Sequence, residues 1–304
     1  MKTFKMVIIL LVVSIGCFTL SRILTAQPAK QLRIMIFGAH PDDPEKSGGT
    51  AAKYIILGHK VCLVSLTNGD AGHFEMGGGA LANRRLKEAQ SSGKIIGADY
   101  IVMDNHDGEL MPTLENRRKV IKVIREFEPD VVIAPRSNDY HPDHRYTAIL
   151  VQDASYLVTV PNIEANTPHL KKSPVFVYVS DGFQKPNPFE PDVVVGIDEV
   201  IEKKIDMYDC HESQMYEWLP YNGRMLSEVP KDKIERRAWM AKQRKNRDKG
   251  IADKYRTLLI ELYGKEKGSI IQYAEAFEGS EYGTPLKKEN IKELFPFFGA
   301  EAYK

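Results

Sequence analysis

The residues best suited to chemistry in this sequence form two short clusters of histidine and aspartate that lie far apart in the chain. The first reads His40-Pro41-Asp42-Asp43 and the second His141-Pro142-Asp143-His144. Imidazole nitrogens and carboxylate oxygens are ligands for zinc and related divalent cations. Two imidazoles and one carboxylate leave a coordination position open, and this is the donor set of a catalytic metal site.

We expect His40, Asp43 and His144 to converge on one metal ion. Each cluster follows an apolar run typical of a buried strand, and the carboxyl ends of parallel strands share one edge of a sheet. If Asp43 binds the metal, the neighbouring side chain of Asp42 points elsewhere and can accept a proton from an activated water. Zinc is the expected metal, although the same ligands accept iron, cobalt or nickel.

Each of these residues also has a simpler structural interpretation. A single aspartate after a strand is more often a helix cap than a ligand, and His-Pro-Asp-His occurs as a plain turn. The coincidence of two such clusters at strand ends favours the metal site. The other histidines have no such neighbours and are interpreted as surface or loop residues: His59, His73, His106 and His169.

The elements that must position the clusters alternate between strands and helices. This alternation predicts an α/β fold, with one Rossmann-like domain whose mostly parallel sheet is flanked by helices. Strands are predicted at residues 32–38, 60–67, 100–103, 131–134, 175–179 and 193–197, with 273–277 a final strand or loop. Helices are predicted at residues 48–57, 81–96, 114–127, 147–157, 198–208 and within 231–262.

Polar residues give the expected helix starts. Ser47 or Thr50 is predicted to cap the first helix. Asp198 is predicted to cap the helix at residues 198–208. The many charged residues of 231–262 are interpreted as a solvated face. Cys62 lies in an apolar run and is interpreted as a core residue.

Length and charge limit the classes of function. The 304 residues, 43% of them hydrophobic, can bury one large core, and we expect a single domain over residues 27–304. The 42 basic and 41 acidic residues leave a net charge of +1. A protein that binds nucleic acid needs a basic face, so nucleic acid is not an expected partner. The sequence indicates no oligomeric state.

Residues 1–26 have the pattern of an export signal. Lys2 and Lys5 precede the apolar run 6–20, and Leu24-Thr25-Ala26 offers a cleavage site before Gln27. We therefore expect a periplasmic or extracellular protein. The alternatives are an uncleaved N-terminal anchor or lipidation at Cys17, and only these would bring the protein into contact with a membrane.

The two clusters resemble the paired signatures of the PIG-L/LmbE-like family of zinc-dependent N-acetyl sugar deacetylases. The family's Ala-His-Pro-Asp-Asp stands here as Ala39-His40-Pro41-Asp42-Asp43, and its His-x-Asp-His as His141-Pro142-Asp143-His144, in the same order. Further similarities extend over residues 32 to about 282: Gly48-Gly49-Thr50, Thr67-Asn68-Gly69-Asp70, Arg85-Leu86-Lys87-Glu88, Asp107-Gly108, Lys204, His211-Glu212-Ser213-Gln214 and Tyr273-Ala274-Glu275-Ala276-Phe277.

The resemblance implies an LmbE-like domain over residues 27–304 that removes an acetyl group from an N-acetylated amino sugar or glycoconjugate. It implies that His40, Asp43 and His144 bind Zn²⁺. It also implies that Asp42 is the general base. These assignments agree with those made from the residues alone.

The same resemblance implies four further roles. His141 would stabilise the tetrahedral oxyanion, with Asp143 orienting it. Arg85 and Asp107 would hold the sugar. The expected partner is therefore a small molecule or glycan that carries an N-acetyl group.

Two other functions remain open. One is a metal-dependent hydrolase of another amide or of a phosphoester. The other is a non-catalytic protein that binds carbohydrate with the help of a metal, but a pure binder does not need the spare carboxylate of Asp42. A nucleotide site is disfavoured, because the first strand-to-helix turn lacks a G-x-G-x-x-G loop.

Overall fold

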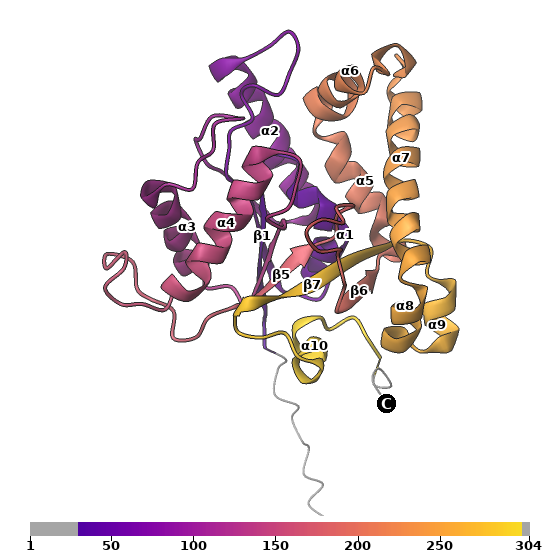
Figure 1. Cartoon of the computed structure of the whole chain (residues 1–304). Helices are drawn as coiled ribbons and strands as arrows, with labels where there is room; N and C mark the ends of the chain where they lie inside the picture. The colour runs from indigo at the N-terminus through magenta and orange to yellow at the C-terminus, as the bar shows by residue number, and fades with distance from the viewer. Residues whose placement is uncertain (1–29, 300–304) are drawn as a thin grey trace, which may run out of the picture. The chain divides into compact units, whose positions relative to one another are not determined.

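The computed structural model describes residues 30–299 of the 304. These residues build a seven-stranded sheet in the order β3-β2-β1-β4-β5-β7-β6. The strands are β1 Arg33–Gly38, β2 Lys60–Ser65, β3 Asp99–Val102, β4 Val131–Ala134, β5 Val175–Val179, β6 Val193–Gly196 and β7 Ala274–Gly283. Figure 1 shows β5, β7 and β6 of this sheet below the helices α5 (Ile201–Asp209) and α7 (Lys233–Lys254). The predicted export signal lies outside the described residues. Within the described part, every helix is too short or too polar to cross a bilayer.

Most of the sheet is parallel, as predicted. β1 pairs in parallel with both β2 and β4, and β3 and β5 continue the sheet outward in the same sense. The predicted final segment 273–277 is a strand, but it is longer than expected and lies inside the sheet. This strand, β7, is antiparallel to both β5 and β6. The α/β class is therefore confirmed, with one antiparallel strand inserted near one edge.

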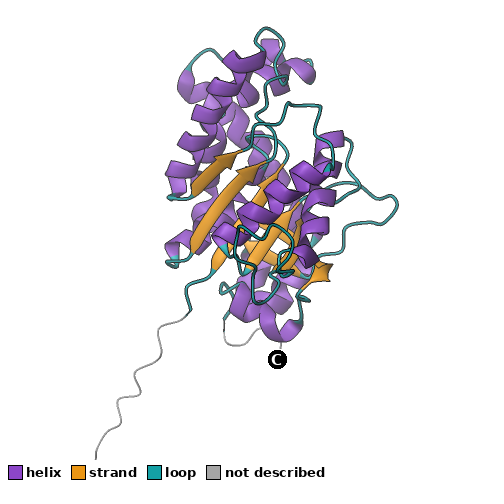
Figure 2. Cartoon of the chain, turned by 90° about the vertical axis from the view of Figure 1, so that its left-hand side faces the viewer, coloured by secondary structure: helices purple, strands orange, loops and turns teal. Residues whose placement is uncertain are grey.

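Helices cover both faces of the sheet (Figure 2). They are α1 Gly48–Ile56, α2 Gly78–Ile96, α3 Leu114–Phe127, α4 Pro142–Leu157, α5 Ile201–Asp209, α6 Leu219–Asn222, α7 Lys233–Lys254, α8 Arg256–Tyr263, α9 Lys265–Ile270 and α10 Lys288–Leu294. Shorter turns are the 3₁₀ helices Pro44–Ser47, Asp198–Val200 and Leu226–Glu228, and the π-helix Ser213–Trp218.

The alternation of side chains along β1 explains why both of its faces are apolar. Ile34 and Ile36 belong to the core cluster that includes residues of α1 and α5. Met35 and Phe37 belong to the cluster on the opposite face, with residues of α3 and α4. Successive side chains of a strand point to opposite faces, so a strand covered by helices on both sides reads as a continuous apolar run. Cys62 of β2 is buried in the second cluster, as predicted.

The helix at the second cluster begins earlier than predicted. We expected a helix from residue 147 preceded by a polar loop, but α4 begins at Pro142. The side chain of His141 caps it by accepting a hydrogen bond from the backbone N–H of Asp143. Proline is well tolerated at a first helical position because it has no N–H to satisfy. His144 is therefore held on a helix rather than on a turn.

The predicted caps of α1 are wrong. The hydroxyls of Ser47 and Thr50 make no hydrogen bond in the structure, although both are buried. The carboxylate of Glu275 caps this helix instead, accepting from the backbone N–H of Gly49 at 2.9 Å and of Thr50 at 2.8 Å. A carboxylate at a helix N-terminus satisfies free N–H groups and interacts favourably with the helix dipole.

Asp198 is not a cap either. Its carboxylate accepts hydrogen bonds from the backbone N–H groups of Gln272 at 3.0 Å and of Tyr273 at 3.2 Å. These residues lead into β7, so Asp198 joins the start of the α5 region to that strand. At both helix starts, the hydrogen bonds that form involve residues of β7 or of the segment just before it. These residues lie far along the chain from the helices, so local sequence does not predict the contacts.

A buried lysine links β7 to α5 and α7. The ammonium of Lys204 lies 2.8 Å from a Glu275 oxygen and 2.9 Å from an Asp248 oxygen, and it donates to the carbonyl of Lys46 at 3.1 Å. Burial disfavours its charged form, but the two carboxylates outweigh this and raise its pKa above the ordinary value. The network therefore ties the β7 cap, α7 and the segment after the first cluster together.

We expect Lys204→Met to destabilise the protein by about 3–5 kcal/mol, because it leaves two buried carboxylates without their cation. Urea unfolding followed by circular dichroism would measure this. Lys245→Met is the matched control on α7, since Lys245 pairs with Glu202 at the exposed surface. Loss of this surface ion pair should lower the free energy of unfolding by no more than about 1 kcal/mol. Equal stability of the two variants would contradict the role given to Lys204.

Candidate active site

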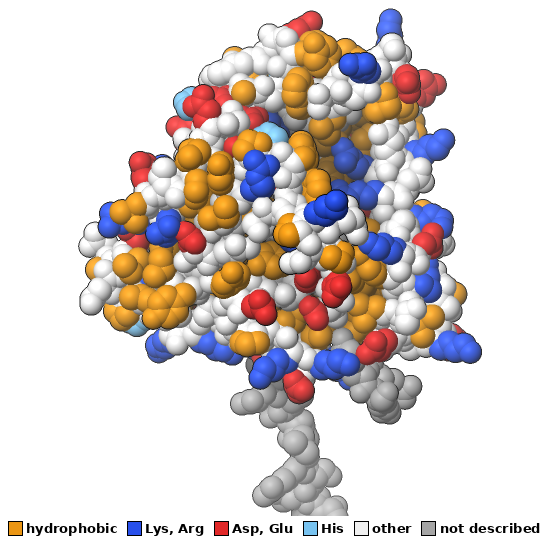
Figure 3. Space-filling model, in the orientation of Figure 1, with side chains coloured by type: hydrophobic (Ala, Val, Ile, Leu, Met, Phe, Trp, Pro, Cys, Tyr) orange, Lys and Arg blue, Asp and Glu red, His pale blue; other side chains and the backbone are white. Residues whose placement is uncertain are grey.

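The two His/Asp clusters meet at the carboxyl ends of β1 and β4, as the sequence predicts. β1 ends at Gly38 and β4 at Ala134, and the two strands are neighbours in the sheet. A cavity of about 760 Å³ opens here, lined by residues of both clusters and of α7. Figure 3 shows a hollow in the surface beside α7, with basic and apolar side chains on its walls.

The corner after β1 depends on a glycine. A Cβ atom at Gly38 would lie 2.5 Å from the Cβ of Asp43 and 2.6 Å from Pro44, so a larger residue would collide with the returning chain. The close approach lets Asp43 Oδ2 accept hydrogen bonds from the backbone N–H of Ala39 at 3.1 Å and of His40 at 2.9 Å. The Asp43 carboxylate is thereby fixed beside the His40 ring.

The three predicted metal ligands form a compact triangle. His40 Nδ1 lies 3.2 Å from Asp43 Oδ2, His144 Nε2 lies 3.2 Å from the same oxygen, and the two nitrogens are 3.3 Å apart. Ligands on a tetrahedral zinc ion, at bond lengths of about 2.0–2.1 Å, lie about 3.3–3.4 Å from one another. The spacing of these atoms therefore fits one ion that binds all three.

The outer ring nitrogens of both histidines are held by carboxylates. His40 Nε2 lies 3.1 Å from Asp107 Oδ1 and 3.3 Å from Asp143 Oδ2. His144 Nδ1 lies 2.9 Å from Asp139 Oδ1. A metal-binding histidine usually donates its other N–H to such a partner, which fixes the tautomer and leaves the inner nitrogen free for the metal. Sequence reasoning missed Asp139, which lies five residues before His144.

The charges around His40 favour a cation in the site. Burial lowers the pKa of His40, but hydrogen bonds to Asp107, Asp143 and Asp43 outweigh it and raise the pKa well above the ordinary value. Burial likewise raises the pKa of Asp43, yet His144 and other cations hold it well below its usual range. Several carboxylates thus converge on two imidazoles, and positive charge, as a proton or a metal ion, stabilises them.

Two other groups of side chains could be considered for a metal. Nitrogens of His40, His141 and His144 lie within 4.8 Å of one another, and so do ligand atoms of His40, Asp107, His141 and Asp143. The sides of the triangle formed with Asp43, at 3.2 Å and 3.3 Å, match the spacing expected around one zinc ion. The second group would also use His40 Nε2, which already lies against two carboxylates. The geometry therefore favours His40, Asp43 and His144 as the candidate metal ligands.

Asp42 lies in the cavity wall but outside the triangle. Its Oδ1 accepts a hydrogen bond from Arg85 Nη2 at 2.8 Å, and both residues line the cavity. The Arg85 side chain is buried, and its Nη1 also donates to the carbonyl of Gly69 at 3.2 Å. The neighbouring aspartates thus have different partners, Asp43 the two histidines and Asp42 the buried guanidinium.

His141 is oriented by the backbone of α4. Its Nδ1 accepts the N–H of Asp143 at 3.2 Å, which places the proton of the neutral ring on Nε2. Burial lowers the pKa of His141, and the nearby His40 and His144 lower it further, so the neutral form is favoured. The ring lines the cavity, where Nε2–H is available as a donor.

The carboxylate of Asp143 makes contacts that differ from those expected if it orients His141. It accepts from the backbone N–H of Gly108 at 2.7 Å and of Leu110 at 3.2 Å, and its Oδ2 lies beside His40. The carboxylate therefore supports His40, while only the backbone of Asp143 orients His141.

Arg85 and Asp107, the residues expected to hold the sugar, both line the cavity. Each is already engaged by protein groups. Arg85 binds Asp42, and Asp107 lies between His40 at 3.1 Å and Arg85 Nη1 at 3.5 Å. A contact of either residue with a sugar stays a prediction.

Residues of the motifs that stand later in the sequence contact the segment that follows the first cluster. Glu45 accepts hydrogen bonds from Ser92 Oγ at 2.6 Å and from His211 at 2.7 Å, and the Glu45 and His211 side chains are fully buried. Gln214, in the π-helix, donates to the carbonyl of Gly72 at 3.0 Å. These contacts connect the segment after α5 to the loops that carry the site.

Sequence reasoning also missed the part of the cavity wall formed by α7. Arg244, Arg247, Ile251 and Lys254 line the cavity from one side of this helix. The charged stretch was interpreted as a solvated face, and this holds only for part of it. The spacing of these residues indicates a common helix face, but not what that face contacts.

Comparisons with known proteins identify relatives of this chain. The family model described as PIG-L, GlcNAc-PI de-N-acetylase, matches residues 35–155, a range that contains both clusters. The chain is 33% identical over 207 residues to diacetylchitobiose deacetylase of Thermococcus kodakarensis. That match covers 62% of this chain and 74% of the relative.

Solved structures show the same fold. N,N'-diacetylchitobiose deacetylase from Pyrococcus horikoshii matches with a TM-score of 0.60 at 23% identity, over 82% of this chain and 83% of that one. GalB, the 4-carboxy-2-hydroxymuconate hydratase of Pseudomonas putida, matches with a TM-score of 0.66 at 17% identity, over 84% and 99%. Since a hydratase and a deacetylase share the fold, the fold alone does not give the activity.

Sequence similarity identifies the family to which this chain belongs. The family model spans both His/Asp clusters, and the Thermococcus relative is matched over most of its length. This chain belongs to the PIG-L/LmbE family of N-acetyl sugar deacetylases.

Proposed function

We propose that this protein is a metal-dependent hydrolase that removes the acetyl group from an N-acetylated amino sugar or glycoconjugate. The observation that carries the proposal is the triangle of His40, Asp43 and His144, with the separately held carboxylate of Asp42 in the same cavity wall. The relative from Thermococcus, a diacetylchitobiose deacetylase by name, supports this reaction class.

The proposed metal is zinc, held by His40 Nδ1, Asp43 Oδ2 and His144 Nε2. When bound, it supplies Lewis acidity that polarises the amide carbonyl and makes a water molecule more acidic. Three protein ligands leave coordination open for substrate and water. Other divalent metals with a preference for nitrogen and oxygen ligands fit the same donors.

Asp42 is the proposed general base. Its carboxylate takes a proton from the water that attacks the acetamide carbonyl, and it returns the proton to the nitrogen of the leaving amine. The hydrogen bond from Arg85 at 2.8 Å holds the carboxylate in one position, and a fixed position is what general base catalysis requires. The products are acetate and a free amino sugar.

His141 is the proposed oxyanion donor. Its Nδ1 is occupied by the backbone N–H of Asp143, so its Nε2–H is the group that can donate to the carbonyl oxygen as negative charge develops there. Fixed donors of this kind lower the barrier because they need no reorganisation during the reaction. We further propose that Asp107, Asp139 and Asp143 act through the ligand histidines, which they contact.

The proposal is tested by acetate release. The purified zinc form should release acetate and free amine in equal amounts from at least one sugar in a panel containing N-acetylglucosamine, diacetylchitobiose and longer N-acetylated glycans. p-Nitrophenyl phosphate in parallel assays tests the alternative of a phosphoesterase. Phosphate release without acetate release from any member of the panel would contradict the proposed function.

A further inference from the structure

One face of α7 presents three cations to the cavity. Arg244, Arg247 and Lys254 line it together with Ile251, and steps of three or four residues place them on the same face of the helix. This face belongs to the second half of the chain, beyond the range that the family model matches. The metal triangle contributes carboxylates and imidazoles, so the cavity has walls of different charge.

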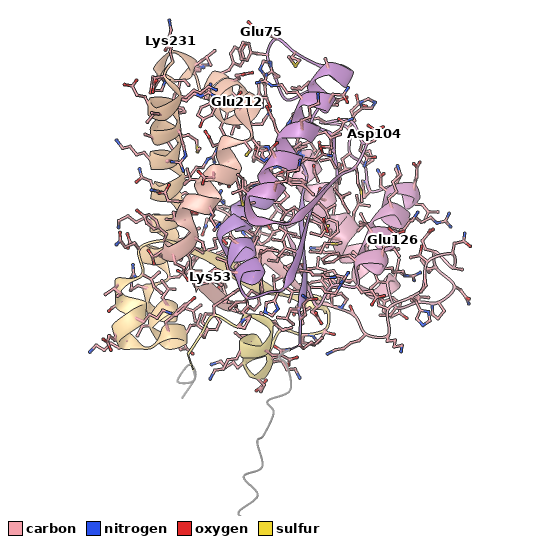
Figure 4. The ribbon with its side chains drawn as sticks, turned by 180° about the vertical axis from the view of Figure 1, so that it is seen from behind. Lys53, Glu75, Asp104, Glu126, Glu212 and Lys231 are labelled. Atoms are coloured by element: carbon pink, nitrogen blue, oxygen red, sulfur yellow. The ribbon has the colours of Figure 1, made fainter. Side chains whose placement is uncertain are left out.

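These three cations differ in their pairing from four other basic residues of α7. Arg236, Arg237, Lys245 and Lys249 each form an ion pair with a carboxylate. Figure 4 shows Glu212, the partner of Arg236, on the segment beside α7. Among residues 30–299, in contrast, no carboxylate lies within ion-pair distance of Arg244, Arg247 or Lys254.

The cavity-facing arginines are held in position by neutral groups. The guanidinium of Arg244 stacks over the Tyr208 ring, 4.7 Å from its centroid, and contacts the sulfur of Met215 at 3.0 Å. Arg247 donates to the carbonyl of Ser180 at 3.4 Å. These neutral groups hold the two guanidinium groups in place but do not neutralise their positive charge.

The cation wall reaches close to the metal site. Arg247 lines the same cavity as Lys46. Lys46 binds the metal ligand Asp43 at 2.8 Å. Arg136, another cation of the cavity wall, is neutralised by Asp181 at 2.7 Å, so the uncompensated charge is concentrated on α7.

We propose that Arg244, Arg247 and Lys254 form an anion subsite, and that the N-acetylated substrate carries a phosphate or carboxylate group that binds there. A wall of a cavity that carries one sign of charge attracts the opposite charge. A guanidinium presents paired donors that match the oxygens of a phosphate or carboxylate. This inference rests on the proposed function, and it narrows the substrate to an acidic N-acetyl sugar or sugar conjugate.

The test compares kcat/KM for acetate release from neutral and acidic sugars. The probes are N-acetylglucosamine, its 1-phosphate and 6-phosphate, and N-acetylmuramic acid, so that phosphate and carboxylate are distinguished. At least one acidic sugar should be preferred over N-acetylglucosamine by about tenfold or more, as expected for charge-assisted hydrogen bonds. Raising the salt concentration should reduce this preference. Equal kcat/KM for neutral and acidic sugars would overturn the subsite.

Variants assign the preference to α7. Arg244→Gln and Arg247→Gln should each reduce the ratio of acidic to neutral kcat/KM, mainly through a higher KM for the acidic sugar. Lys242→Gln, an exposed residue of the same helix that does not line the cavity, should keep the wild-type ratio. A wild-type ratio in both arginine variants would refute the assignment.

A binding measurement separates failure of the subsite from failure of the proposed function. If no sugar releases acetate, the proposed function is wrong. Calorimetric titration with N-acetylglucosamine 1-phosphate and 6-phosphate, N-acetylmuramic acid and N-acetylglucosamine then tests the subsite alone. Tighter binding of an acidic sugar to the wild type than to Arg247→Gln would support the anion subsite, and equal affinities would refute it.

Discussion

Asp42→Asn is expected to lower the rate of acetate release by about 10²–10⁴-fold, the usual contribution of a general base. The zinc content should stay at the wild-type level, because the proposed metal ligands are Asp43, His40 and His144. An amide has nearly the same shape as a carboxylate but cannot accept the proton of the attacking water. Acetate assays and elemental analysis of the same preparation measure both quantities.

The control for this prediction is Asp104→Asn, the same chemical change at an exposed aspartate that binds Asn68 at 2.9 Å and does not line the cavity. This variant should keep wild-type turnover. Wild-type turnover in Asp42→Asn as well would show that another group accepts the proton. Loss of zinc from Asp42→Asn would show that the two neighbouring aspartates do not have separate roles.

His144→Ala is expected to lose both the bound metal and the activity, because it removes one corner of the triangle. Elemental analysis should find far less than one zinc per chain after gel filtration. Circular dichroism would establish that α4 still forms, since His144 is buried in its first turn. Full zinc occupancy in this variant would contradict the ligand assignment.

Asp139→Asn should weaken metal binding less than His144→Ala does. The Asp139 carboxylate contacts the outer nitrogen of His144 at 2.9 Å and accepts from the backbone N–H of His141 at 3.0 Å, so it should act by orienting that proposed ligand. Loss of such a partner typically weakens metal binding by about 10–100-fold. Zinc titration should therefore give an affinity between those of the wild type and His144→Ala. An Asp139→Asn affinity equal to that of the wild type would leave the outer contact without a role.

The convergence of the two His/Asp clusters could be predicted from sequence because their placement follows from local rules. Apolar runs followed by His and Asp indicate strand ends, and parallel strands bring those ends to one edge. His40 and His144 therefore meet although 104 positions separate them. The separate directions of Asp42 and Asp43 were also predictable, since neighbouring side chains rarely share a partner.

The interactions that could not be predicted depend on residues distant in sequence. The N-terminus of α1 is capped by Glu275, 226 positions away from Gly49, where propensity favoured Ser47 or Thr50. Such a contact follows from the position of β7 inside the sheet, and no local pattern encodes it. The cavity-facing side of α7 was missed for the same reason, since its residues are charged and their surroundings come from other parts of the chain.

The resemblance to a family gave roles but not partners. It implied that Asp107 holds the sugar and that Asp143 orients His141. The structure places both carboxylates against His40 Nε2, at 3.1 Å and 3.3 Å. A motif records which residues recur, whereas the contacts of a carboxylate depend on loop geometry around it. Support of His40 is thus a role that only the structure could suggest.

The most direct test of the central claim is a metal titration of the wild-type protein. Protein stripped with a chelator is titrated with zinc, and acetate release from an N-acetylated sugar is measured at each step. The account predicts no activity without metal and a linear rise that ends at one zinc per chain. Full activity in the stripped protein, or no acetate from any N-acetylated sugar with one zinc bound, would contradict it.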